Sequence, residues 1–261
     1  MSTIAAQALL TGTAIPSAAM DNATAIAVQG GATGARQFLT GFIAAYSAAV
    51  ASIKTVTIKT GGTGPTGPIQ TAGLGIGSTD TQVASAAFQY AIGNAHYKKA
   101  IVAAGTALAA GTIPINKWGL YLFSINAGGT IACTAAAANF TTGYASEALA
   151  IAALPATPAN SVSMGYVTVQ TKVGTTFVGG TDSLNGGGSG NIANATNYTS
   201  TAVIEGTTTV CSIPWDFTNG PLICSLPGIL KSAYAEGIAA ELAASGTGGI
   251  TGTVTLFGFA S

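Results

Sequence analysis

The strongest pattern of apolar and polar positions lies in the middle of the chain, between residues 118 and 173. Residues 118–125 are an almost unbroken apolar run, short enough to be a strand buried on both faces. Residues 126–134 contain a glycine turn and a second short segment, which predicts the return strand of a hairpin. Residues 165–173 alternate, as a half-buried strand does. The pattern predicts a compact β-sheet module.

Three other segments carry a helical pattern. In residues 35–53, apolar side chains that include Phe38 and Phe42 recur at spacings of three and four, which predicts an amphipathic helix. Residues 229–245 show a similar stripe, and the glycines that follow are typical of a helix C-terminus. Residues 144–154 are strong helix formers, and the prolines after them end that helix.

The rest of the chain is mostly strand-like, with glycine-rich connections between short β-branched segments. Further strands are expected at residues 55–59, 86–92, 95–99, 177–181, 201–205, 208–213, 221–226 and 250–259. The expected fold class is a β-rich α+β protein, with antiparallel sheets and a few amphipathic helices packed on them.

Three parts follow from this order of elements. Residues 1–85 are an N-terminal helix-strand part, residues 86–197 a central β-rich module, and residues 198–261 a C-terminal part with strands, a helix and a final strand. Both end parts contain an amphipathic helix followed by a strand rich in threonine and valine. We therefore expect residues 1–85 to pack with residues 198–261 in one α+β unit, with their terminal strands side by side.

The composition changes the picture of the surface. Apolar residues make up 48% of the chain, but charged residues only 6%, against about 25% in an ordinary soluble domain. The formal net charge is zero, which protects a monomer poorly against association. Much of the surface is therefore expected to be covered by copies of the chain or by another protein. Nucleic acid is not an expected partner, because the eight basic residues are scattered.

A membrane is not an expected partner either. The longest apolar helical segment, within residues 35–53, is interrupted by polar residues and is shorter than the ~20 residues that a bilayer span needs. The N-terminal region has no basic segment followed by an apolar core, so no secretory signal is expected.

The chain has three cysteines, Cys133, Cys211 and Cys224. An odd number without a secretory signal does not indicate a framework of disulfides. Cys211 and Cys224 flank a Pro-Trp-Asp-Phe segment and are able to meet across a hairpin. Buried free thiols are the favoured interpretation, and a disulfide between Cys211 and Cys224 is the alternative.

Side chains able to do chemistry are few. His96 is the only histidine and has no acidic neighbour in sequence, so it is expected to be a polar strand residue. Glu236 and Glu241 are expected on the solvated face of a helix, and Asp182 and Asp216 in turns or caps. We therefore predict no catalytic residue, no cofactor site and no metal site, and a protein that is not an enzyme.

Aromatic residues in the strands have two possible uses. They can form a platform on which a ligand stacks, or they can belong to the core or to a subunit interface, which is more usual at strand spacing. The candidate interface residues are Trp118, Tyr121, Phe123, Tyr166, Phe38, Phe42 and Trp215.

Several motifs between Phe88 and Asn197 resemble a known family. They are Phe88-x-Tyr-x-Ile92, Trp118-Gly-Leu-Tyr-Leu-Phe-x-Ile-Asn126, Tyr144-x-Ser-Glu-Ala-Leu-Ala-x-Ala-Ala-Leu154, Met164-Gly-Tyr-Val-Thr-Val169 and Phe177-Val-Gly-Gly-Thr-Asp-Ser-Leu184. Together they resemble the virion proteins of tailed bacteriophages of the capsid-decorating or head-fibre type.

This resemblance implies a non-enzymatic, β-rich surface protein of a virion, made in the host cytoplasm and bound to the outside of the capsid. Its expected partners are further copies of itself, most simply in a trimer, and the major capsid protein. Residues 1–85 and 198–261 fall outside the resemblance and are candidates for the part that binds the particle. The alternatives are a tail, baseplate or fibre protein, or a virion adhesin that binds host glycans.

Overall fold

The computed structural model describes residues 13–31, 35–93, 95–186, 191–193, 197–233 and 236–260. These residues form antiparallel β-sheets almost throughout, which confirms the β-rich prediction. The described helices are α2 (Glu147–Ala152) and the short 3-10 helix η1 (Phe217–Asn219), so the expectation of several amphipathic helices is wrong.

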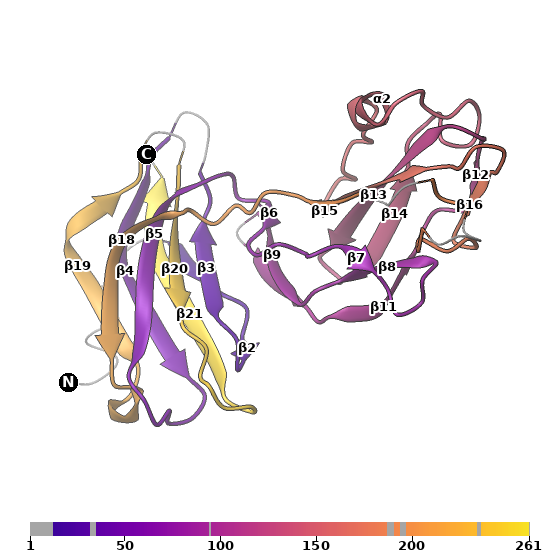
Figure 1. The fold of residues 1–261 in the computed structure, drawn as a ribbon. Coiled ribbons are helices and arrows are strands. Elements are labelled where there is room, and N and C mark those ends of the chain that lie inside the picture. Colours follow the sequence, from indigo (N-terminus) through magenta and orange to yellow (C-terminus); the bar gives the residue numbers. More distant parts are fainter. Residues whose placement is uncertain are drawn as a thin grey trace. The chain divides into compact units, whose positions relative to one another are not determined.

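The chain divides into two compact units (Figure 1). The first unit combines Met1–Gln70, Gln89–Lys98 and Val203–Ser261, and the second combines Thr71–Phe88 and Lys99–Ala202. The segment Gln89–Lys98 therefore belongs with the chain ends and not with the unit that contains most of residues 86–197.

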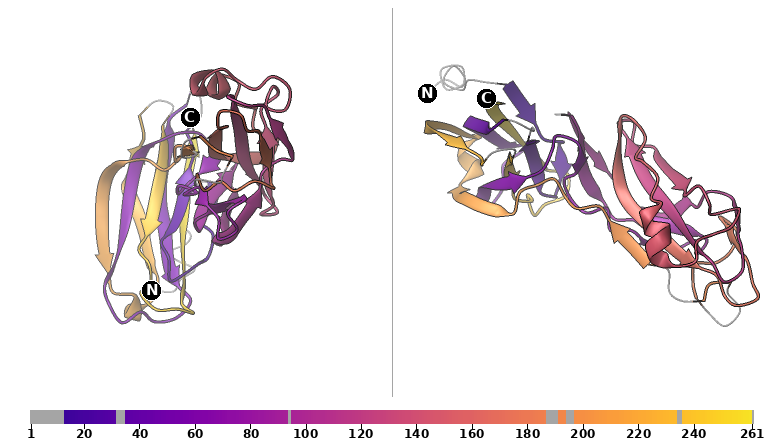
Figure 2. Two further views of the ribbon diagram at one scale, coloured as in Figure 1. Left: turned by 45° about the vertical axis from the view of Figure 1, so that its right-hand side comes forward. Right: turned by 90° about the horizontal axis from the view of Figure 1, so that it is seen from above.

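Two sheets dominate the first unit. The β4 sheet has the order β1-β21-β4-β19, with β2 also paired to β21, and the β5 sheet has the order β18-β5-β20-β3. Figure 2 shows the strands of this unit from two further directions. Their strands are β1 (Thr13–Pro16), β2 (Met20–Asp21), β3 (Ala25–Gln29), β4 (Gln37–Tyr46), β5 (Lys54–Gly62), β18 (Thr208–Trp215), β19 (Leu222–Lys231), β20 (Gly237–Leu242) and β21 (Thr251–Ala260).

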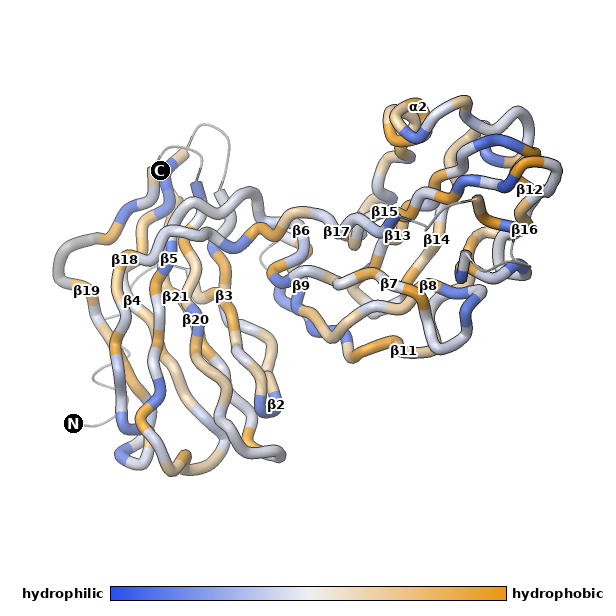
Figure 3. The backbone as a smooth tube through the Cα atoms, in the orientation of Figure 1, coloured by the Kyte–Doolittle hydropathy of each residue, from blue (hydrophilic) through white to orange (hydrophobic). Residues whose placement is uncertain are grey.

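The inner faces of these two sheets share one core. Phe42 and Leu256 of the β4 sheet and Ile58 and Leu242 of the β5 sheet are fully buried in the same apolar cluster. Along β21, buried and half-buried residues alternate as the period of a strand requires. The hydropathy of the backbone follows the same pattern, with apolar segments on the strands (Figure 3). The first unit is thus a β-sandwich.

The two long predicted helices are strands of this sandwich. Residues 35–53 contain β4, which is buried along most of its length because it lies between β21 and β19. Residues 229–245 contain the end of β19 and all of β20, a central strand of the β5 sheet, while residues 234 and 235 lie outside the described residues. Strand β20 is buried on both faces and therefore has no clear alternation, and in β4 a register shift in the pairing with β21 interrupts the alternation, so alanine made both segments resemble helices.

The expected pairing of the terminal strands is also wrong. The strand predicted at residues 55–59 is part of β5, and the one predicted at residues 250–259 is β21. They belong to different sheets of the sandwich. Since the preceding helices are strands as well, the two ends of the chain are not repeats of a helix-strand motif.

A small sheet covers the outer face of the β5 sheet. It has the order β10-β9-β6, formed by β6 (Gly67–Pro68), β9 (Phe88–Ile92) and β10 (Ala95–Lys99). Ile26, Val28 and Ala239 of the β5 sheet pack in one cluster with Ile69 and Ala91 from this cover. The β5 sheet is therefore buried on both faces where the cover lies.

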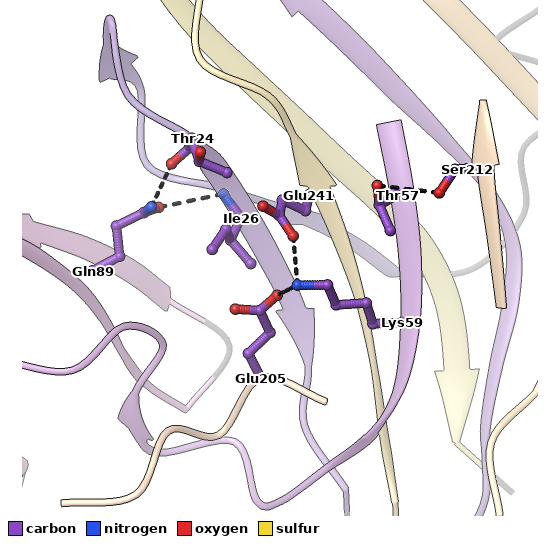
Figure 4. Close-up of polar contacts among 8 residues, drawn as sticks. All are labelled: Thr24, Ile26, Thr57, Lys59, Gln89, Glu205, Ser212 and Glu241. Carbon is purple, nitrogen blue, oxygen red and sulfur yellow. Dashed lines mark hydrogen bonds and ion pairs between the residues drawn. The ribbon is translucent and has the colours of Figure 1, made fainter. Parts of the chain in front are cut away.

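Side chains of the cover also hydrogen-bond the edge strand β3. The N–H of Ile26 donates to Oε1 of Gln89 at 3.3 Å, and the N–H of Val28 donates to Nε2 of His96 at 2.8 Å. Gln89 in turn donates to the carbonyl of Thr24 at 2.5 Å (Figure 4). Because an exposed strand edge invites pairing with another chain, these contacts protect β3. They occupy His96 Nε2 as an acceptor, which requires that this nitrogen carry no proton.

The second unit contains the module predicted from the central pattern. Its main sheet has the order β14-β13-β15-β17, formed by β13 (Trp118–Asn126), β14 (Ile131–Ala135), β15 (Ser161–Gln170) and β17 (Asn197–Ser200). Two smaller sheets comprise β11-β8-β7 and β12-β16, formed by β7 (Gly75–Ile76), β8 (Gln82–Ser85), β11 (Val102–Ala107), β12 (Gly111–Ile113) and β16 (Phe177–Gly179).

One glycine is essential to the main sheet of the second unit. Gly165 lies beside a register shift in the pairing of β13 with β15 and has a φ of +134°. A Cβ at this position would lie 2.0 Å from the carbonyl oxygen of Thr199 on β17. Only a residue without a side chain allows β15 and β17 to pair this closely.

Candidate interaction surface

The most concentrated group of charges lies on the β5 sheet. Nζ of Lys59 on β5 is 2.5 Å from Oε1 of Glu205 and 2.5 Å from Oε2 of Glu241 on β20 (Figure 4). All three side chains are mostly buried. The ammonium group of Lys59 therefore pairs with two carboxylates, and the cluster carries one excess negative charge.

The pKa shifts in this cluster show that it is an ion network. Burial raises the pKa of Glu205; its hydrogen bond and charge interaction with Lys59 oppose this shift, and the nearby Glu241 adds to it. Burial alone would lower the pKa of Lys59, but hydrogen bonds to Glu205 and Glu241 outweigh it and raise that pKa. Lys59 is therefore held as an ammonium ion, which is not a nucleophile.

Replacing Lys59 with methionine is expected to lower the free energy of unfolding by about 1–2 kcal/mol at neutral pH, because two neighbouring carboxylates lose their cation. The folded-state pKa of Lys59 lies above its ordinary value of 10.5. Its contribution is therefore complete below pH 10.5 and is lost as the pH rises through the folded-state pKa. Urea unfolding from neutral to strongly alkaline pH measures the difference between wild type and variant.

The matched control for this experiment is Glu205→Gln, which keeps the pair of Lys59 and Glu241 and removes the excess charge. We expect it to cost less than Lys59→Met. A stability difference between wild type and Lys59→Met that stays constant up to strongly alkaline pH would contradict the role given to Lys59.

The two loop aspartates have the structural roles expected of them. Asp216 caps η1, and its hydrogen bonds from the side chain and backbone of Thr218 lower its pKa. Oδ2 of Asp182 accepts hydrogen bonds from the N–H of Val178 at 2.7 Å and from Nδ2 of Asn191 at 2.8 Å. Among the described residues, no group of three or more histidine, cysteine or acidic side chains is placed to hold a metal ion.

A cavity of about 290 Å³ opens in the first unit. Its described lining has no ionisable side chain and consists of Thr13, Ile15, Gln29, Gly30, Gly31, Gln37, Pro65, Gly258, Phe259 and Ala260. Two buried amides belong to this lining, and Nε2 of Gln29 donates to Oε1 of Gln37 at 2.7 Å. Phe259 is partly exposed and stacks on Phe38, with ring centroids 5.0 Å apart. This cavity is suited to a small neutral molecule and not to an ion.

The candidate interface aromatics fall into two groups. Phe42 is buried in the core of the sandwich, and Tyr121 and Phe123 are buried within the second unit, so none of the three offers a surface to a partner. Tyr121 and Phe123 are core because β13 is buried along nearly its whole length, and Phe42 is core because it belongs to the cluster between the two sheets of the sandwich. The half-buried members are Trp118, Tyr166, Phe38 and Trp215.

The half-buried aromatics pack mainly against their own chain. Trp118 and Tyr166 pack against a small cluster that contains Ala150 of α2. Trp215 packs on the sandwich core and donates its indole N–H to the carbonyl of Gly220 at 3.1 Å. Phe38 lies beside the cavity through its contact with Phe259.

An exposed apolar feature of the second unit is α2 with the segment after it. Leu149, Ile151 and Leu154 are 54%, 37% and 41% exposed, and we call these three side chains the α2 face. Residues 148–160 contain no charged residue. The apolar colour of α2 can be followed in Figure 3. Leu149 and Ile151 are two residues apart and project to different sides of the short helix, so the α2 face is a group of exposed apolar side chains around α2 and not a single stripe. Grouped exposed apolar side chains mark interaction sites more often than single ones do.

The charged residue of α2 is turned to its own sheet. Oε1 of Glu147 accepts hydrogen bonds from Thr168 of β15 at 2.7 Å and from Asn197 of β17 at 2.6 Å. The side chain of Ser146 caps the helix by accepting from the N–H of Leu149. These contacts hold α2 against the sheet through its polar residues and leave Leu149 and Ile151 outside.

No helix among the described residues has the length and apolar character required to cross a membrane. Comparison with known proteins finds no matching family model, no matching curated protein and no matching solved structure.

Proposed function

We propose that this chain is a non-enzymatic structural protein of a bacteriophage virion, which decorates or stabilises the outside of the capsid. Its partners are further copies of itself, most simply in a trimer, and the major capsid protein, so its location is the capsid surface after synthesis in the host cytoplasm. The observation that carries the assembly part is the exposed, uncharged α2 face. The virion part rests on the resemblance of residues 88–197.

The physics of the α2 face supports association. Burying a fully exposed leucine or isoleucine stabilises a complex by about 1.5–3 kcal/mol, and the three side chains of the α2 face, which are 37–54% exposed, can each gain roughly half of that. No charge in residues 148–160 has to lose its water when the face is covered. A copy repeated many times on a shell makes this contact at every site, so a modest gain per contact stabilises the whole assembly.

A charge placed on the α2 face is expected to weaken assembly. In the double variant Leu149→Lys and Ile151→Lys, two ammonium groups would have to be buried, which should lower the affinity between copies at least tenfold. Sedimentation velocity measures the loss of the oligomer, and co-sedimentation with empty expanded capsids measures binding to the particle.

The control variant is Val173→Lys, which adds a charge in the same unit at a valine that is 84% exposed and outside the α2 face. It is expected to assemble like wild type. If the double variant keeps the mass and capsid binding of wild type, the α2 face is not the interface. Self-association without capsid binding would favour a tail, baseplate or fibre protein.

The uncharged cavity favours one other candidate, a virion adhesin that binds neutral host glycans. Sugar rings pack on partly exposed aromatic side chains, and Phe259 lines the cavity in that state. Retention of the intact protein on a glycan array, lost in Phe259→Ala, would support this function. Absence of retention on every neutral glycan would remove it.

A further inference from the structure

Two of the three cysteines lie on edge strands of different sheets in the sandwich. Cys211 is on β18, at one end of the β5 sheet, and Cys224 is on β19, at one end of the β4 sheet. Both are free thiols and partly buried. They therefore do not face each other across one hairpin, as the sequence alone allowed, but belong to opposite layers.

Both thiols point into the space between the layers. Cys211 is directly opposite Ile58 in the pairing of β18 with β5, and Cys224 is directly opposite Phe42 in the pairing of β19 with β4. Directly opposite residues of an antiparallel pair project to the same face. Ile58 and Phe42 are fully buried in the sandwich core, and both cysteines pack against that core.

The two cysteines also share one edge of the sandwich. Strand β20 contacts both β21 and β4, and β3 contacts β21 and β1. The order of the strands across one sheet therefore matches the order across the other. The remaining ends, β18 and β19, then lie at the same edge of the sandwich, and Figure 1 shows them side by side. Burial raises the pKa of Cys224, and the nearby Cys211 adds to that shift, as expected for thiols close to each other.

We propose that Cys211 and Cys224 form a disulfide that joins the two sheets of the sandwich when the protein meets a disulfide oxidant. One thiol loses its proton and its sulfur attacks the oxidant, for example oxidised glutathione, forming a mixed disulfide and releasing one small thiol. The second protein thiolate attacks the first protein sulfur and releases the second small thiol. The two protein thiols thus lose two electrons in all, and these electrons reduce the oxidant to two small thiols.

The third cysteine provides the internal contrast. Burial raises the pKa of Cys133 to about 11, and its sulfur accepts a hydrogen bond from the N–H of Ala109 at 3.3 Å. A thiol that remains protonated and buried reacts slowly with a disulfide. Cys133 lies in the second unit, where the described residues hold no other cysteine. We therefore expect it to stay free when the other two are oxidised.

A link between β18 and β19 has a measurable effect on stability. The disulfide would close a loop of residues 211–224, and a loop of that length is expected to raise the melting temperature of the sandwich by about 5–10 °C. The gain arises because the unfolded chain loses freedom while both edges are held in place. This result does not depend on the proposed capsid function, so failure of either proposal leaves the other intact.

The test is to incubate the full-length protein with oxidised glutathione at mildly alkaline pH and to count thiols after denaturation. The count is expected to fall from the three of the reduced chain to one, with Cys133 left free. Peptide mapping without reductant should find Cys211 joined to Cys224, and the melting temperature should rise. Cys133→Ser should form the same disulfide, with its thiol count falling from two to zero, and Cys211→Ser should gain a glutathione adduct at Cys224 without the rise in melting temperature.

Three results would overturn the proposal. They are a count that stays at three, stable glutathione adducts on both Cys211 and Cys224, and disulfides that join separate chains or include Cys133. Each would show that the sulfurs at the sandwich edge do not reach each other in the folded protein.

Discussion

Replacing Phe42 with alanine is expected to lower the free energy of unfolding by about 3–5 kcal/mol. Phe42 is fully buried in the sandwich core, where it lies opposite Cys224 of β19 and Leu256 of β21. Truncation removes most of a buried aromatic side chain and leaves a cavity that the two sheets cannot close completely. Urea unfolding measures the loss as a lower midpoint at an unchanged slope.

The matched control is Phe38→Ala, which is expected to cost only about 1 kcal/mol because Phe38 is half-buried and makes one ring contact with Phe259. On a helix, residues four apart share a face, so the two variants would have similar effects. On β4 they differ because the pairing with β21 passes from Gly41 to Leu39 and leaves Thr40 out. Equal losses for the two variants would contradict this register.

Replacing Gln89 with leucine is expected to lower the free energy of unfolding by about 2–4 kcal/mol, because it leaves one buried and one partly buried backbone group without a partner. The side chain of Gln89 is fully buried. It accepts from the N–H of Ile26 and donates to the carbonyl of Thr24 beside the edge strand β3. Leucine has a similar volume but neither a donor nor an acceptor. Urea unfolding again measures the change.

The control for this prediction is Gln70→Leu. Gln70 is only partly buried, and its side chain accepts a longer bond of 3.3 Å from Gln89. We expect a loss below about 1 kcal/mol, since Gln89 keeps its contacts with β3. If Gln70→Leu destabilises the protein as much as Gln89→Leu, the protection of the β3 edge by Gln89 is not what stabilises this region.

The strands β13, β14 and β15 of the second unit could be predicted because their patterns are local. The apolar run that became β13 is too short for a helix with one buried face, and the alternation that became β15 fits a strand. The prolines after residue 154 also placed the end of α2 closely, although only Glu147–Ala152 is helical. In each case the residues that decide the structure lie within the element itself.

The strands β4 and β20 could not be predicted because their surroundings decide their structure. Both are central strands, and β20 is covered on its outer face by β9 and its neighbours. A strand that is buried on both faces has no alternation, and the register shift at Thr40 breaks what periodicity remains in β4. Alanine then favours a helix in isolation, and the partners that override it are more than one hundred residues away in the chain.

The candidate surface was predictable only in part. With only 6% charged residues, the sequence indicates that part of the surface is covered by a partner, but it does not indicate which part. Aromatic residues at strand spacing, such as Tyr121 and Phe123, fit either a core or an interface, and the structure buries both because β13 has a partner strand on each side and is buried along nearly its whole length. A usable signal lay in α2, since Leu149, Ile151 and Leu154 are more apolar residues than its one buried face can hold.

The mass of the wild-type chain in solution tests the central claim most directly. Sedimentation equilibrium over a wide range of concentrations is expected to give an assembly of several chains, in the simplest case three times the chain mass of 25.4 kDa. A stable, monodisperse species of 25.4 kDa at every concentration would show that this nearly uncharged surface does not need a neighbour.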